Sequence, residues 1–145
     1  MKEQNYNNHV RYYTSHHFVF YPVVTIAFII SIRCTIVYPA QSFVWVAISC
    51  LLVLIAWLSY MMRQHYALNN QNRIVRLELR FRYYILTGQR LEPIEQKLSF
   101  GQLAALRFAS DEELPALTER AVNEHLSSDA IKRSIKDWQP DNMRV

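Results

Sequence analysis

The chain has 145 residues, of which 51% are hydrophobic and 19% are charged, and its formal net charge is +4. This length excludes two full domains and allows one hairpin with one small additional unit. The average composition matches that of an ordinary soluble protein, but it combines two different halves. Residues 43–62 contain no charged side chain, whereas the sequence after them is densely charged.

Two apolar stretches, residues 18–38 and 43–62, are separated by only four residues, 39–42. Each stretch can cross a hydrocarbon core of roughly 30 Å at about 1.5 Å per helical residue. We therefore predict a transmembrane helical hairpin over residues 18–62, after an N-terminal arm of residues 1–17. A cleaved signal peptide is a weaker interpretation, because cleavage after Ala40 would place Tyr38 where a small residue is needed.

Arg33 is the one charged residue within a predicted span. A charge at membrane depth is by default a functional hypothesis. Arg33 lies five residues before Tyr38, about 7 Å from that end of the helix. Its long side chain can reach the headgroups there, so we favour snorkelling. Pairing with a partner subunit is the alternative, because this chain offers no acidic residue at that depth.

The distribution of basic residues predicts the orientation of the hairpin. The four-residue turn has no Lys or Arg, whereas the arm has Lys2 and Arg11 and the sequence after Met62 is rich in arginine. Positive charge stays on the cytoplasmic side of a membrane. We therefore expect a multi-pass protein of the bacterial inner membrane with both termini in the cytoplasm.

The candidate metal ligands do not form a site. Cys34 and Cys50 lie at different membrane depths, by roughly 5 Å of helical rise, which argues against a disulfide. His9, His16 and His17 have no Cys or carboxylate at ligand spacing. We expect no metal and no cofactor.

Residues 63–98 begin with a segment that fits two patterns. Residues 75–83 alternate strictly between apolar and charged side chains, which is typical of a strand. A helix would instead gather five apolar residues on one face. We favour the helix, because no other segment can pair with a lone strand. Gly88 would cap this helix, residues 69–72 are the expected bend, and the apolar face comprises Ile74, Leu77, Phe81, Tyr84 and Ile85.

The same helix carries a basic face formed by Arg73, Arg76 and Arg80. Residues 63–98 contain seven basic and three acidic side chains. The simpler interpretation is a solvated helix close to the membrane. The more specific one is contact with anionic lipid headgroups, at about 1 kcal/mol per basic residue.

Residues 99–145 predict a tail of three short helices after a linker over residues 91–98. Ser99 can cap the first helix, residues 110–113 have the pattern of a capping box for the second, and Ser127 or Ser128 can cap the third. About forty residues rarely hold a stable core alone. We therefore predict a docking surface that needs further apolar contact, from helix 73–87, a second copy or another protein: Phe100, Leu106, Phe108, Ile131, Ile135 and Trp138.

The last two helices also have the spacing of a helix-turn-helix, which would bind nucleic acid. The charge count argues against this, because residues 99–145 contain six basic and eight acidic side chains. A DNA-binding domain usually needs a basic face to neutralise phosphates.

Several runs of residues carry a resemblance to a known family. They are Asn5-Tyr6 with His9, residues 82–88 (RYYILTG), residues 103–113 (LAALRFASDEE) and residues 135–141 (IKDWQPD). Over most of its length the chain resembles an uncharacterised bacterial family of small two-span membrane proteins with a helical tail. The resemblance implies an inner-membrane setting, and it brings no activity, cofactor or functional residue.

The sequence thus predicts an all-α membrane protein that is not an enzyme. It has no Ser/His/Asp or Cys/His arrangement, and Gly88 and Gly101 are its only glycines, too few for a phosphate-binding loop. We expect an accessory or scaffold subunit that contacts the lipid bilayer and docks an unknown protein partner or forms a homo-oligomer. The alternative is a membrane-tethered regulator whose tail binds nucleic acid.

Overall fold

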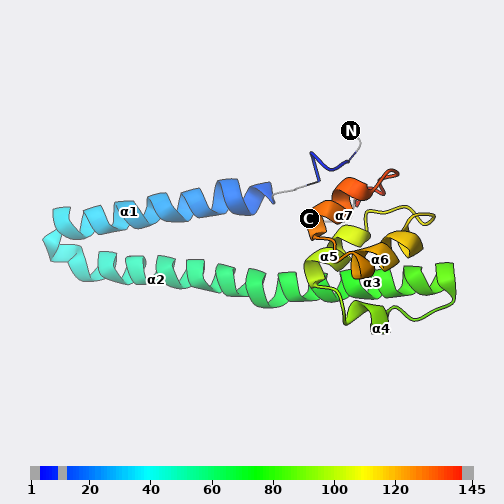
Figure 1. Cartoon of the computed structure of the whole chain (residues 1–145). Helices are drawn as coiled ribbons and strands as arrows, with labels where there is room; N and C mark the ends of the chain where they lie inside the picture. The colour runs from blue at the N-terminus through cyan, green and yellow to red at the C-terminus, as the bar shows by residue number, and fades with distance from the viewer. Residues whose placement is uncertain (1–3, 10–12, 142–145) are drawn as a thin grey trace. The chain divides into compact units, whose positions relative to one another are not determined.

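The computed structural model describes residues 4–9 and 13–141, and within these ranges all regular elements are helices (Figure 1). The described residues form two compact units. One consists of residues 13–69, and the other of residues 4–9 together with residues 70–141. The all-helical fold class is therefore confirmed, and each unit is described by itself below.

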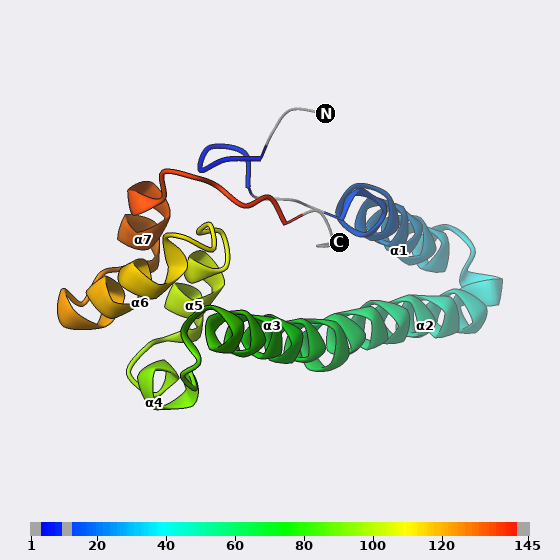
Figure 2. The same cartoon turned by 90° about the vertical axis from the view of Figure 1, so that its right-hand side faces the viewer.

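The first unit is a pair of long helices at the positions expected from the sequence. Figures 1 and 2 both show α1 and α2 side by side. Both helical stretches are long and apolar enough to cross a membrane. The elements are η1 (Ser15–Phe20), α1 (Tyr21–Val37), η2 (Pro39–Gln41), α2 (Ser42–Met61) and η3 (Met62–Leu68), of which η1 and η3 have π-helical and η2 has 3-10 geometry.

The two helices meet through small polar side chains at the centre of their contact. Ser31 and Ser49 are buried, and their hydroxyl oxygens lie 2.7 Å apart. Each hydroxyl also lies within hydrogen-bonding distance of a carbonyl of its own helix, that of Phe28 or Trp45. Because two hydroxyl protons serve three contacts, one serine donates across the interface while the other donates within its own helix. Such a bond lets the helices approach closely.

The outward faces of α1 and α2 are apolar and accessible. Ile36 is 73% exposed and Phe43 is 85% exposed. In the most apolar 18-residue stretch of each helix, only 6% of the residues are buried. These apolar side chains are therefore accessible in this chain, whereas a soluble core would bury them.

The second unit is built on one long helix and four short ones. The helical prediction for residues 75–83 is confirmed, and Gly88 ends that helix in the left-handed region at φ 69°. Residues 69–72 are helical, and the departure from α-geometry precedes them in η3. The elements are α3 (Asn69–Thr87), α4 (Glu92–Glu95), α5 (Phe100–Leu106), α6 (Leu114–Asn123) and α7 (Ser128–Ser134).

The core of this unit includes the segment predicted to be a linker. Leu91 and Leu98, which flank α4, are buried at 1% and 8% exposure. They join Leu79 and Tyr83 of α3 in one cluster with side chains of α5, α6 and α7. Leu91, Ile94 and Leu98 of this segment therefore pack into the core, and α4 lies within the stretch that the sequence assigned to a linker.

The helix ends agree with the sequence in two cases of three. Ser99 forms a capping box with Gln102, and the Ser127 hydroxyl accepts a hydrogen bond from the Ala130 amide at 3.1 Å. The capping box over residues 110–113 is wrong, because α6 begins later, at Leu114. The carboxylate of Glu113 instead accepts hydrogen bonds from the backbone amides of residues 136 and 137.

We predict that Ser49→Ala weakens the pairing of α1 and α2. Loss of the interhelical hydrogen bond should lower the free energy of unfolding by about 1 kcal/mol. Reversible unfolding of the full chain in mixed detergent micelles measures this. The matched control is Cys50→Ala, which alters an exposed neighbour on the same helix and should leave the unfolding free energy unchanged. Equal losses in both variants would contradict the role of the serine pair.

Candidate interaction surface

One face of α3 completes the core of the second unit. Val75, Leu79 and Tyr83 follow each other at four-residue spacing and are 5%, 2% and 2% exposed. Burial, followed by the negative charge of Glu119, raises the pKa of the Tyr83 phenol above its ordinary value. The face supplies the apolar surface that the short helices could not provide alone. The sequence named helix 73–87 as one possible source of this surface, but it grouped a different set of apolar residues.

Two arginines beside this face bind a buried carboxylate. Glu95 of α4 is 5% exposed and accepts hydrogen bonds from Arg76 and from Arg80 Nε. Burial alone would raise the pKa of Glu95, but the two guanidinium groups outweigh it and hold that pKa below its ordinary value. The pair therefore fixes α4 against α3.

A third arginine ties α3 to the connection between α5 and α6. Arg82 Nε pairs with Asp111, and the same guanidinium donates to the carbonyls of Arg107 and Ala109. One side chain thus satisfies three acceptors in this connection. Asp111 was expected in a capping box, and the structure uses it in this tertiary contact instead.

The predicted lipid-binding face is consequently divided. Arg76 and Arg80 contact Glu95, whereas Arg73 is exposed and forms no ion pair within the described part of the chain. Contact of this face with lipid headgroups stays a prediction, and Arg73 is the member whose charge is not already used by Glu95.

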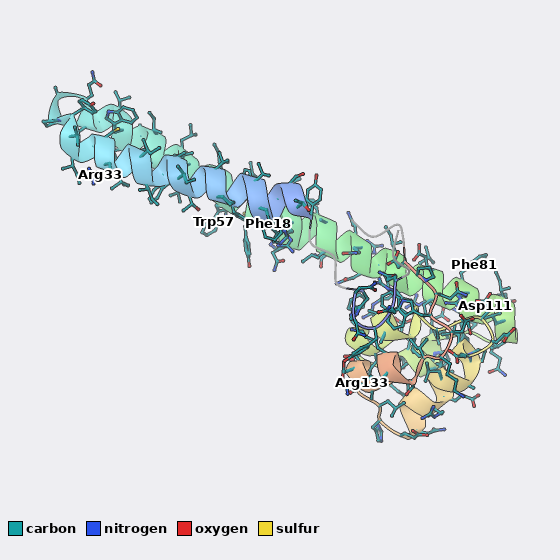
Figure 3. The ribbon with its side chains drawn as sticks, turned by 90° about the horizontal axis from the view of Figure 1, so that it is seen from above. Phe18, Arg33, Trp57, Phe81, Asp111 and Arg133 are labelled. Atoms are coloured by element: carbon teal, nitrogen blue, oxygen red, sulfur yellow. The ribbon has the colours of Figure 1, made fainter. Side chains whose placement is uncertain are left out.

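The opposite side of α3 carries an apolar stripe that the other described residues of the second unit leave exposed. Figure 3 shows Phe81 on the side of α3 away from the short helices. The stripe contains the five residues that the sequence placed on one helical face, and each is more than half exposed. They are Ile74 (54%), Leu77 (66%), Phe81 (66%), Tyr84 (55%) and Ile85 (63%).

The predicted docking residues of the tail mostly lie inside the unit. Leu106, Phe108 and Ile131 are at most 2% exposed, so they form the core and not a docking surface. Phe100 is half-buried, and the Arg76 guanidinium carbon lies over its ring, 5.5 Å from the ring centroid. Ile135 packs against the core after α7 has ended.

Trp138 also follows α7, so Ile135 and Trp138 lie beyond the last helix of the tail. Its backbone forms a β-bridge with Ala109, and its ring stacks on Phe108 at 4.6 Å between centroids. His9 from the N-terminal arm lies against both rings, at 5.9 Å from each. Phe108 and Trp138, which the sequence assigned to a docking surface, thus pack against each other and against His9.

Residues 4–9 of the N-terminal arm belong to this unit, a contact that no local sequence pattern predicted. The Tyr6 hydroxyl donates to Asp129 at 2.6 Å, and this bond, with the charges of the nearby basic residues, lowers the pKa of Asp129. Lys132 Nζ lies 3.1 Å from His9 Nε2. The runs that carried the family resemblance, around Tyr6, His9 and residues 135–141, are therefore neighbours in space. The only sequence signal for this contact was that both runs belong to the set that carries the family resemblance.

The remaining candidates stay apart. Arg33 is exposed on α1 near the turn of the helix pair, as Figure 3 shows, and both snorkelling and partner contact remain predictions for it. Cys34 and Cys50 are free thiols. Among the described residues, no group of three His, Cys, Asp or Glu side chains could hold a metal ion.

A family model described as a family of unknown function (DUF6526) matches residues 1–145, the whole chain. The chain belongs to DUF6526. Searches of curated proteins and of solved structures returned no match. The family membership agrees with the resemblance to an uncharacterised family. The geometry of this DUF6526 chain, with the apolar stripe on α3, is the remaining guide to function.

We predict that Glu95→Gln destabilises the second unit by about 2 kcal/mol, because two guanidinium groups lose their counter-charge. This is less than for a fully buried pair, since Arg76 and Arg80 are 39% and 40% exposed. Urea unfolding in mild detergent measures the loss through Trp138 fluorescence, with Trp45 and Trp57 replaced by Phe. Glu92→Gln, which removes an exposed pair with Arg90, is the control and should have no comparable effect.

The same pair predicts a pH dependence. The pKa of Glu95 is lowered from 4.5 on folding, so its contribution is complete above 4.5 and is lost as pH falls through the folded-state value. The difference in unfolding free energy between wild type and Glu95→Gln should therefore shrink from about pH 7 to about pH 3. A difference that stays constant over this range would exclude an ionic contribution from Glu95.

Proposed function

We propose that the chain is a non-catalytic integral protein of the bacterial inner membrane. In this proposal α1 and α2 cross the bilayer as a hairpin, and the second unit lies in the cytoplasm as an accessory or scaffold module. The module presents the apolar stripe of α3 as its binding surface.

The exposed apolar surface of α1 and α2 supports the membrane assignment. In water this surface would favour aggregation, whereas hydrocarbon would solvate it without cost. Ser31 and Ser49 satisfy each other at the helix contact, as polar side chains need to do in hydrocarbon. Arg33 near the turn could reach the far headgroups.

The observation that carries the scaffold proposal is the stripe itself. Phe81 and Leu77 are each 66% exposed on a helix whose other face is firmly packed. A contiguous apolar surface on a folded unit is typical of an interaction site. Glu95 and Asp111 form ion pairs with arginines of α3. Their charges thus hold the unit together, which leaves the apolar stripe as the surface available for a partner.

The nucleic-acid alternative gains less from the structure. Lys132 contacts His9, and Arg133 pairs with Asp129 at 3.0 Å and lies over the Tyr6 ring. These cations are thus already near groups of the same chain, and phosphate would compete with those contacts. We therefore retain the scaffold proposal as the function that the geometry supports best.

We predict a defined pattern of cysteine labelling in intact cells. In a chain with Cys34→Ala and Cys50→Ala, Gln41→Cys in η2 should react with an impermeant maleimide from the periplasmic side of intact cells. The matched variant Gln89→Cys, in the exposed loop after α3, should react only after the membrane is permeabilised. The reverse pattern, or release of the chain by alkaline carbonate, would overturn the membrane proposal.

A further inference from the structure

We infer that the apolar stripe of α3 binds the same stripe of a second copy of this chain, forming a parallel two-helix contact. The inference rests on the proposed function, because it takes both copies to be anchored in one membrane. It adds to that proposal the identity of the partner and the register of the contact.

The spacing of the stripe is that of a coiled-coil seam. Ile74, Leu77, Phe81 and Tyr84 are separated by three, four and three residues, which places them at successive a and d positions of a heptad. All four side chains are more than half exposed. Two helices that present such a seam bury it against each other at a shallow crossing angle.

The seam has a free side on which a second helix can lie. At roughly 100° per residue, Leu77 and Phe81 are on the side of α3 opposite to Val75, Leu79 and Tyr83. The short helices cover the latter face. A second α3 can therefore approach the stripe without displacing the core of either copy.

Charges beside the seam fit a parallel pair in one register. With Ile74 at position a, Arg73 is at g and Glu78 is at the following e position, and in parallel helices these two positions face each other between chains. Both side chains are exposed. Within the described residues neither forms an ion pair. Arg82, one turn after Glu78, contacts Asp111 instead of Glu78. A symmetric dimer would contain two Arg73–Glu78 pairs.

The membrane anchor selects the parallel orientation. Each α3 follows directly from α2 through η3, so two copies with the same topology enter their α3 helices from the same side. Two heptads form a weak contact in solution, but anchoring in one membrane raises the effective concentration of the partner.

A lipid surface is the other possible occupant of the stripe, and the charges favour the second copy. Glu78 borders the stripe, and a carboxylate would be repelled by anionic headgroups. The same carboxylate is complementary to Arg73 of another chain. The 3-4-3 spacing serves either occupant, so the complementary charges of Arg73 and Glu78 decide between them.

Cysteine cross-linking in native membranes tests the inference. In the background without Cys34 and Cys50, Leu77→Cys should give a disulfide-linked dimer on mild oxidation, because d positions of parallel partners are adjacent. Asn123→Cys, exposed on α6, is the control and should stay monomeric. An antiparallel pair would instead link Leu77→Cys to Phe81→Cys in mixed samples, and that result would overturn the parallel register.

A charge exchange tests the register independently. Arg73→Glu alone and Glu78→Arg alone should each lower the dimerisation constant by about tenfold, because both pairs become repulsive. The double variant Arg73→Glu with Glu78→Arg should restore cross-linking at Leu77→Cys. Unchanged cross-linking in the single variants would overturn the assigned register.

Two further measurements separate the possible failures. A fluorophore on Leu77→Cys that is quenched by spin-labelled lipid, with no cross-link, would show that lipid covers the stripe and would overturn the inference. Absence of both signals would overturn it as well. The Gln41→Cys labelling of intact cells reports the membrane topology separately, so a failed dimer leaves the proposed function intact.

Discussion

The second unit depends on the burial of one face of α3. Leu79 and Tyr83 enter a cluster formed by residues of four other short segments, none of which has the length to hold a core. Without these side chains, the cluster would lose its packing against α3. The short helices therefore pack around α3. We infer that residues 91–141 need this preceding helix in order to fold.

Arginines on both sides of that face determine where α4 and the connection between α5 and α6 contact α3. Arg76 and Arg80 bind Glu95 of α4, and Arg82 binds the turn that leads to α6. Apolar contact alone would allow α3 to slide or rotate in the core, because the hydrophobic effect has no direction. The ion pairs have direction, and they permit one register. The same contacts engage two of the three arginines that the sequence assigned to a lipid-facing surface.

The sequence predicted the elements with a regular pattern and missed contacts between distant segments. The two apolar helices, the caps at Ser99 and Ser127 and the Gly88 terminus follow from local chemistry, and the structure contains all of them. Which apolar face of α3 would be buried depends on neighbours that local patterns do not specify. The docking of Tyr6 and His9 near residues 129–138 depends on pairing across more than 120 residues, for which no periodicity exists.

The strand-like alternation of residues 75–83 has a physical explanation in the helix. Residues two apart lie about 200° apart around a helix axis, and residues four apart lie on one side. Val75, Leu79 and Tyr83 therefore form one face, while Leu77 and Phe81 form the opposite one. A helix with apolar residues on two opposite sides needs two neighbours. The chain itself supplies the first neighbour, and the exposed second face is the reason to expect another helix there.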